Sequence, residues 1–176
     1  MNTNAPSAAG ECAELLRQGL DLIEALADEH YAPNDAGLDD APGTASVGAH
    51  FRHAIDFFDC LLTGLDARRI DYSTRKRRVD VEHARPAGTR EIRRALEGLE
   101  ALRALEESLP LEVRTEPEQT WAHSTLAREL HFVAGHTLHH YALVRLTLVG
   151  LGIEAPPEFG IAPSTLAHRA GEEGKR

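Results

Sequence analysis

Apolar residues recur every three or four positions over four long stretches of the chain, which is the spacing of a buried face on an α-helix. The predicted helices run from Ala8 to Glu29, from Ser46 to Leu65, from Thr89 to Ser108 and from Thr125 to Val149. A glycine or proline lies at or near the end of each stretch, where it interrupts a helix. The pattern therefore predicts an all-α fold, an antiparallel four-helix bundle.

The fourth predicted helix differs from the others because its middle is apolar on nearly every side. Leu130, Phe132, Val133, Leu138 and Val144 lie within this stretch and do not fall on one face. A helix of this kind is buried on most sides. We therefore expect it at the centre of the bundle.

The connections carry weaker signals. The loop Asn34–Gly43 is rich in Asp, Gly and Pro, and residues 66–88 carry many charges, so both are expected to be solvated connections. Between the last two helices, Leu111–Thr115 alternates apolar and polar residues, which predicts a short strand. A second extended stretch at Trp121–His123 offers it a partner, so the bundle is expected to include a short two-strand element.

Composition and charge narrow the class of protein. A chain of 176 residues fits one domain over 1–176, with residues 1–7 and 171–176 expected to fray. The net charge of −9 argues against a nucleic-acid partner. No run of apolar residues is long enough to predict a membrane span, and no signal-peptide pattern precedes the first helix. Two widely spaced cysteines suit a reduced compartment, so the cytoplasm is the expected location.

Histidine is the outlier in the composition, with ten residues in the chain. His136 and His140 are four positions apart on a predicted helix, so both imidazoles lie on one face and can reach a common point. This is the spacing that HExxH motifs use for zinc. The glutamate of that motif is absent from the run His136-Thr-Leu-His139-His140, which removes most of the support for a peptidase.

Two further observations favour a metal site over two chance histidines. The helix around them is apolar, and burying two adjacent imidazoles without a partner is costly. A second pair, His50 and His53, lies on another long predicted helix. Three protein ligands with one open position form the usual catalytic zinc site. A helical wheel puts His50 nearer the apolar face and His53 on its flank, so spacing alone leaves the third ligand open.

Other polar residues near the histidine pair have two interpretations each. Glu129 lies on the same stripe as His136, two turns earlier, and is a candidate to orient an imidazole from outside the ligand set. Its alternative role is an ion pair with an arginine. His139 points to a different side of the helix and is expected to be a hydrogen-bonded structural histidine. His131 lies on the far side and is assigned no role.

Two short motifs resemble the DinB/YfiT-like superfamily, and the order of elements resembles it over essentially the whole chain. The motifs are Ser46-Val-Gly-Ala-His50-Phe-Arg-His53-Ala-Ile-Asp56 and Gly135-His136-Thr-Leu-His139-His140. The resemblance implies a four-helix bundle. It also implies that a histidine about seven residues into the second helix, often followed by an aspartate three residues later, joins the HxxxH pair as a metal ligand.

The resemblance therefore selects His53 as the third ligand, because His53 lies seven residues after Ser46 and Asp56 follows three residues later. His50 remains the alternate ligand or a residue of the pocket. The ligand set implied by the resemblance is His53, His136 and His140. The metals associated with similar proteins include zinc and nickel, so the expected cofactor is one divalent ion of this kind.

The resemblance implies a broad function. Similar proteins include transferases and isomerases that use low-molecular-weight thiols such as mycothiol or bacillithiol, and others are regarded as metal-dependent hydrolases. The leading hypothesis is a metal-dependent enzyme acting on a small molecule, as a thiol-dependent transferase or a hydrolase. Dimers are common among similar proteins, which leaves a homodimer as one option. The alternatives are a non-catalytic metal-binding or stress-response module and a bundle without metal.

A low-molecular-weight thiol carries carboxylates, so a site for it calls for arginines at its mouth. Arg52, Arg75, Arg77 and Arg78 are available in the sequence. The alternative for this run of charges is a solvated loop.

Overall fold

The computed structural model describes residues 7–32, 45–162, 165–166, 168 and 171. The elements follow in the order α1 (Ala8–Ala25), α2 (Asp28–Tyr31), α3 (Val47–Gly64), β1 (Arg69–Asp71), η1 (Tyr72–Thr74), α4 (Val79–His83), α5 (Arg85–Leu102), β2 (Pro110–Arg114), β3 (Ala122–Thr125) and α6 (Leu126–Gly150). The predicted loop Asn34–Gly43 lies outside the described residues, as do most of the ends that were expected to fray.

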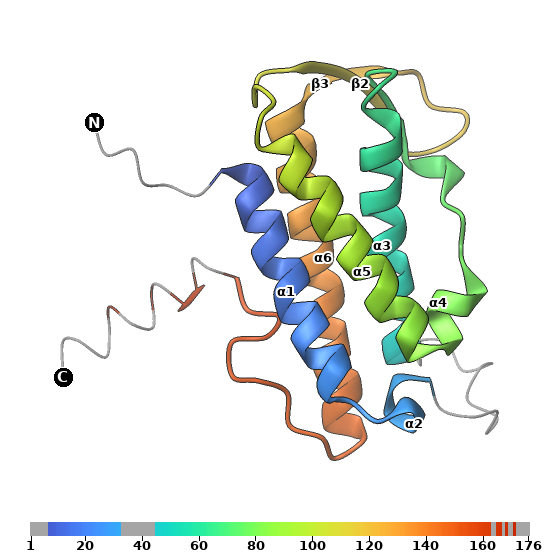
Figure 1. Cartoon of the computed structure of the whole chain (residues 1–176), viewed down its shortest axis with the longest axis vertical. Helices are drawn as coiled ribbons and strands as arrows, with labels where there is room; N and C mark the ends of the chain where they lie inside the picture. Colours follow the sequence, from blue (N-terminus) through green and yellow to red (C-terminus); the bar gives the residue numbers. More distant parts are fainter. Residues whose placement is uncertain (1–6, 33–44, 163–164, 167, 169–170, 172–176) are drawn as a thin grey trace.

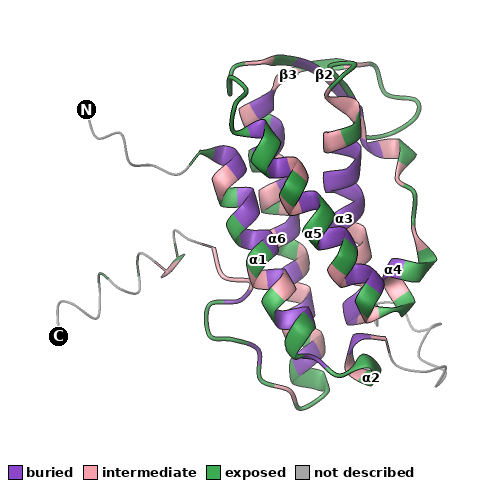
Figure 2. Ribbon diagram, in the orientation of Figure 1, coloured by how far each residue is buried: buried purple, intermediate pink, exposed green. Residues whose placement is uncertain are grey.

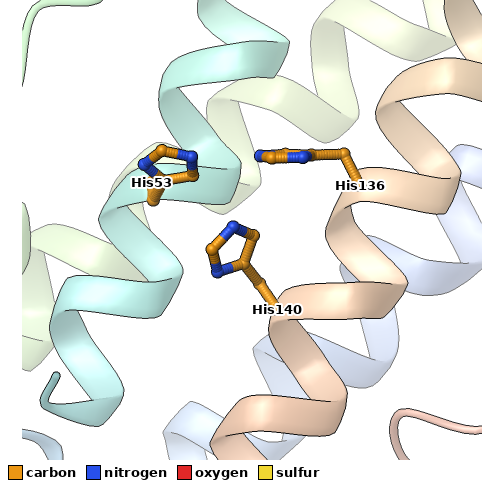
Figure 3. A group of neighbouring side chains, drawn as sticks. All are labelled: His53, His136 and His140. Atoms are coloured by element: carbon orange, nitrogen blue, oxygen red, sulfur yellow. The ribbon is translucent and has the colours of Figure 1, made fainter. Parts of the chain in front are cut away.

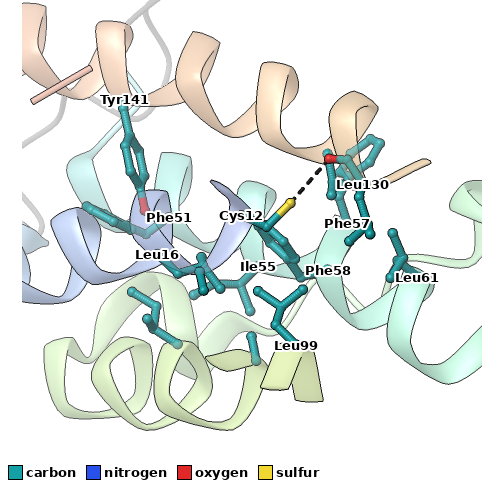
Figure 4. Close-up of a cluster of buried hydrophobic side chains, with 14 of the residues drawn as sticks. Cys12, Leu16, Phe51, Ile55, Phe57, Phe58, Leu61, Leu99, Leu130 and Tyr141 are labelled. Atoms are coloured by element: carbon teal, nitrogen blue, oxygen red, sulfur yellow. Dashed lines mark hydrogen bonds between the residues drawn. The ribbon is translucent and has the colours of Figure 1, made fainter. Parts of the chain in front are cut away.

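The four long helices α1, α3, α5 and α6 pack together along their lengths (Figure 1). Helix α1 packs against α5 and α6, and α3 packs against the same two helices. Buried residues line their inner faces (Figure 2). The core contains Leu16, Ile55, Phe58, Leu61 and Leu99, drawn in Figure 4, and each of these side chains is at most 2% exposed.

The prediction of an all-α four-helix bundle is wrong. Within the described residues the chain forms six α-helices and a three-stranded mixed sheet in the order β1-β2-β3. Strand β1 pairs parallel to β2, and β2 pairs antiparallel to β3, with Leu111 opposite Ser124. The sheet lies at one end of the long helices (Figure 1).

The charged connection between α3 and α5 is the main difference from the sequence prediction. It forms β1, η1 and α4 instead of a solvated loop. Three apolar side chains of this connection are at most 1% exposed and pack in the core, namely Ile70, Tyr72 and Val81. Their burial supplies the apolar contacts that offset the cost of ordering a charged segment.

Side-chain caps account for several helix starts. Ser46 accepts a hydrogen bond from the Ala49 N–H at the start of α3, the usual role of a serine at the N-cap position. Helix α6 is capped by Thr125, which accepts a hydrogen bond from the Arg128 N–H. Helix α5 begins four residues before the predicted Thr89, because Pro86 fits the first turn of a helix.

In the part of the chain that the structure describes, no helix is both long enough and apolar enough to cross a bilayer.

Candidate metal centre

Three histidines from two helices converge on one point (Figure 3). His53 comes from α3, and His136 and His140 come from successive turns of α6. One ring nitrogen of each lies within 4.8 Å of the others. A zinc ion with nitrogen ligands at about 2.0–2.1 Å needs these nitrogens about 3.3 Å apart. Rotation of the imidazoles would bring them to this separation.

The rings lie close enough for one ion to bridge them. The ring centroid of His53 is 5.0 Å from that of His136 and 4.5 Å from that of His140. The two α6 rings are 4.7 Å apart. The packing of α3 on α6 brings His53 to the pair, because the i, i+4 spacing already stacks His136 and His140 on one face of α6.

Phe57 forms the apolar side of the cluster. It follows His53 by one helical turn, and its ring centroid lies 4.0 Å from that of His136 and 5.2 Å from that of His53. Phe57 itself is buried. The histidines therefore lie against a surface that offers no hydrogen-bond partner on this side.

Burial sets the charge state of the three histidines. Burial, reinforced by neighbouring positive groups, lowers the pKa of His53 to about 4 and that of His136 to about 4. The same causes lower the pKa of His140 to about 3. All three rings are therefore neutral near pH 7, the form in which a ring nitrogen can coordinate a metal.

His136 also carries an unsatisfied polar atom. Its Nε2 is buried and has no hydrogen-bond partner among the described residues. Such an atom costs about 1–3 kcal/mol when it is left unpaired. Coordination of a cation would satisfy it, so the donor set fits a divalent metal.

His50 lies beside the cluster and outside the three-histidine group. Its Nδ1 is 3.1 Å from the Nδ1 of His140, so one of these nitrogens carries the shared hydrogen. This contact leaves the Nε2 of His140 for a metal, which is how a neighbouring group commonly orients a ligating imidazole. Burial, followed by the effect of His139, lowers the pKa of His50.

Glu129 is fully buried, but its contacts lie away from the histidines. It accepts hydrogen bonds from the Tyr72 hydroxyl at 2.9 Å and from Ser124, and it pairs with Arg128 at 2.7 Å. Within the described residues, none of its hydrogen bonds or ion pairs goes to a histidine. Its link to the cluster is indirect, because Tyr72 stacks on Phe57, which contacts His136.

The other sequence candidates lie at the edge of the cluster or away from it. His139 is exposed, and its ring centroid is 5.3 Å from that of His140. Asp56 is 1% exposed and accepts a hydrogen bond from the Arg77 N–H at 3.1 Å. The same oxygen, Oδ2, forms an ion pair with Arg52 at 3.6 Å, and the buried Oδ1 has no hydrogen-bond partner among the described residues.

Two residues beside the cluster were given no specific role from the sequence. Phe57 could have been found, because it follows His53 by four positions on the same helix face. Arg75 was one of four arginines available for a thiol, and no signal separated it from the others. Its guanidinium lies 4.9 Å from the ring centroid of Phe57.

Comparisons with known proteins leave the family open. No family model and no solved structure matches the chain. Over 104 residues the chain is 30% identical to a protein named FK506-binding protein 5 from Rhizopus delemar. The match covers 56% of this chain and 27% of that protein, so the chain spans about a quarter of the relative's length. This similarity does not bear on the resemblance to DinB/YfiT-like proteins, which stays a prediction.

Proposed function

We propose that the chain is a metal-dependent enzyme that resembles DinB/YfiT-like proteins and holds one divalent ion, zinc or nickel, with His53, His136 and His140. The observation that carries the proposal is the convergence of three ring nitrogens within 4.8 Å, in which the Nε2 of His136 is buried without a hydrogen-bond partner in the described part of the chain. Three protein ligands with an open position are typical of catalytic sites, whereas structural zinc sites usually have four.

The residues around the cluster suit a reaction on a small molecule. A divalent ion, when bound, supplies Lewis-acid chemistry and a coordination position for a water or a thiol sulfur. His50 orients the imidazole of His140 through their shared hydrogen. Phe57 keeps water from one side of the rings. Thiol-dependent transfer and hydrolysis are the two reaction classes consistent with this arrangement.

Elemental analysis of protein without a polyhistidine tag tests the proposal. We expect about one equivalent of zinc or nickel in the wild type and none in His136→Ala. His139→Ala is the matched control, because His139 is an exposed histidine on the same helix, and it should keep the metal. No metal in the wild type, even after incubation with zinc and nickel salts, would contradict the proposal.

A non-catalytic module that holds metal for structure or sensing is the alternative. A structural metal is needed for folding, so its removal unfolds the domain. This chain buries an extended apolar core that continues well away from the three histidines. We therefore expect chelation to lower the melting temperature only modestly. Unfolding of the chain on addition of EDTA would favour the structural alternative.

The local identity to the protein named FK506-binding protein 5 favours one further candidate, the binding of FK506. Titration of the chain with FK506, followed by the fluorescence of its single tryptophan, Trp121, tests it. A saturable change at micromolar ligand would support this candidate, and no change by fluorescence or calorimetry would remove it.

A further inference from the structure

The charge balance of the candidate site is incomplete. Three neutral imidazoles contribute no negative charge, so a divalent ion held by them would keep its full charge. Asp56, the buried acid three residues after His53, does not belong to the three-histidine group, and its Oδ2 contacts the Arg77 N–H and Arg52. The inference below rests on the proposed metal site and adds the class of ligand that the site takes.

Arg75 brings another positive charge to the same place. Its guanidinium lies over the ring of Phe57, which itself contacts His136 and His53. One nitrogen of the guanidinium donates to the Tyr72 carbonyl at 2.8 Å. The charge of Arg75 is among the causes that lower the pKa of His53 and of His136, after burial and the nearer histidines.

Arg75 has no acidic partner among the described residues, unlike Arg52 and Arg78. It is also less exposed than Arg77, which has no acidic side-chain partner there either. Arg52 pairs with Glu82 at 2.9 Å, and Arg78 pairs with Glu91 at 2.6 Å. Arg75 is only half-exposed, and just one of its nitrogens makes a hydrogen bond. A guanidinium that has no acidic partner and lies near a metal site favours a ligand that carries a negative charge. Carboxylates in particular bind its paired N–H groups strongly.

The backbone around Arg75 is fixed on both sides. Before it, the Tyr72 hydroxyl donates to the buried Glu129. After it, the N–H of Arg77 donates to the buried Asp56. These anchors restrain the backbone on either side of Arg75, and the bond of its guanidinium to the Tyr72 carbonyl restrains the side chain, which reduces the entropy that binding would lose.

We propose that Arg75 is a specificity-determining residue that binds a carboxylate of the ligand whose other end reaches the metal. The shared chemistry is an anionic small molecule with a metal-binding group at one end. It suits both a carboxylate-bearing thiol and a carboxylate-bearing substrate for hydrolysis.

Cobalt(II)-loaded protein tests the proposal, because thiolate coordination gives a charge-transfer band that reports binding. The probes are 3-mercaptopropionate, which carries a carboxylate, and 2-mercaptoethanol, which does not. We expect the wild type to bind 3-mercaptopropionate roughly tenfold more tightly than 2-mercaptoethanol. Arg75→Gln should abolish this preference and leave the affinity for 2-mercaptoethanol unchanged, while Arg75→Lys keeps part of it.

Arg77→Gln is the matched control, because it removes the same charge from an exposed side chain two residues away. It should keep the preference for the carboxylate. Equal binding of both probes by the wild type, or an unchanged preference in Arg75→Gln, would overturn the role of Arg75. Either result would leave the metal proposal standing, since cobalt and thiol would still bind.

A second experiment applies if the protein takes up no cobalt or binds neither thiol. The Nε–Hε resonance of Arg75, assigned by its loss in Arg75→Gln, is followed by NMR while acetate is added. A saturable shift that is absent from other arginine resonances supports the carboxylate site, even where the metal proposal has failed. No saturable shift overturns the carboxylate site.

Discussion

Helix α3 contributes to two polar clusters that differ in how their charges are balanced. Toward α6, His53 meets His136 and His140, and among the described residues no acidic side chain joins this group. Toward α5, Asp59 pairs with Lys76 and is also hydrogen-bonded by Arg94.

The pKa directions separate the two clusters. Burial would raise the pKa of Asp59, but hydrogen bonds from Lys76 and Arg94 outweigh it and lower the pKa. In the histidine cluster, burial and neighbouring positive groups act together against the charged form. In the carboxylate cluster Asp59 is paired with basic side chains, although two nitrogens of Arg78 are buried without a hydrogen-bond partner among the described residues. The histidine cluster has no acidic partner among the described residues, and a cluster of this kind is a candidate for binding.

The largest expected change in stability comes from breaking the balanced cluster. Asp59→Ala removes the shared partner of three basic side chains, among them the half-buried Arg78. We expect the free energy of unfolding to fall by about 3 kcal/mol, measured by urea denaturation. Metal content should stay unchanged. Loss of metal with little loss of stability would reverse the roles assigned to the two clusters.

Glu129→Ala should have the next largest effect, because it leaves the buried Tyr72 hydroxyl without its acceptor. We expect a loss of about 2 kcal/mol in the free energy of unfolding. The control is Glu112→Ala, which breaks an exposed ion pair with Arg69 and should cost less than about 1 kcal/mol. A tenfold or greater loss of metal affinity in Glu129→Ala would show that this carboxylate acts on the histidines, as the sequence suggested.

A substitution in the histidine cluster should not lower the free energy of unfolding, in contrast to the two substitutions above. His136→Leu removes a buried nitrogen that lacks a partner and keeps an apolar side chain against Phe57. In metal-free protein we expect the free energy of unfolding to stay level or to rise by up to about 1 kcal/mol. Denaturation with a chelator present measures it. A loss above about 2 kcal/mol would mean that the imidazole already has a stabilising partner.

The last prediction concerns the pH dependence of stability. The three histidines have folded pKa values of about 3 to 4, below the ordinary value of 6.5. Below pH 6.5 the unfolded chain therefore binds protons that the folded chain does not, so stability falls as the pH drops toward 4. Melting temperatures of metal-free protein between pH 8 and 4 test this.

The control for the pH dependence is a double variant, His53→Leu with His136→Leu, in which the decline should be shallower. Identical slopes in the wild type and in the double variant would contradict the assigned pKa directions.

Much of the site could be predicted from local sequence, because helical spacing is a local property. The i, i+4 spacing placed His136 and His140 on one face. The choice between His50 and His53 could not be made this way, since it depends on how α3 is rotated and shifted against α6. The resemblance selected His53, and the structure brings His53 into the group with the other two.

The parts of the fold that were missed depend on contacts between distant residues. Strand β1 pairs with β2 across more than forty residues, with Ile70 opposite Val113, and the charges around Ile70 hide the apolar pattern that a strand shows. One of the two roles expected for Glu129, an ion pair with an arginine, is present with Arg128, but its hydrogen bond from Tyr72 was missed for the same reason. A helical wheel relates it to His136, but its partner Tyr72 comes from a different part of the chain.

Anomalous diffraction at the zinc or nickel edge, from crystals of tag-free protein, tests the central claim most directly. The account predicts one peak about 2.0–2.1 Å from a ring nitrogen of each of His53, His136 and His140. A metal-saturated crystal with no peak there, or with its peak at His50 and His139, would contradict it.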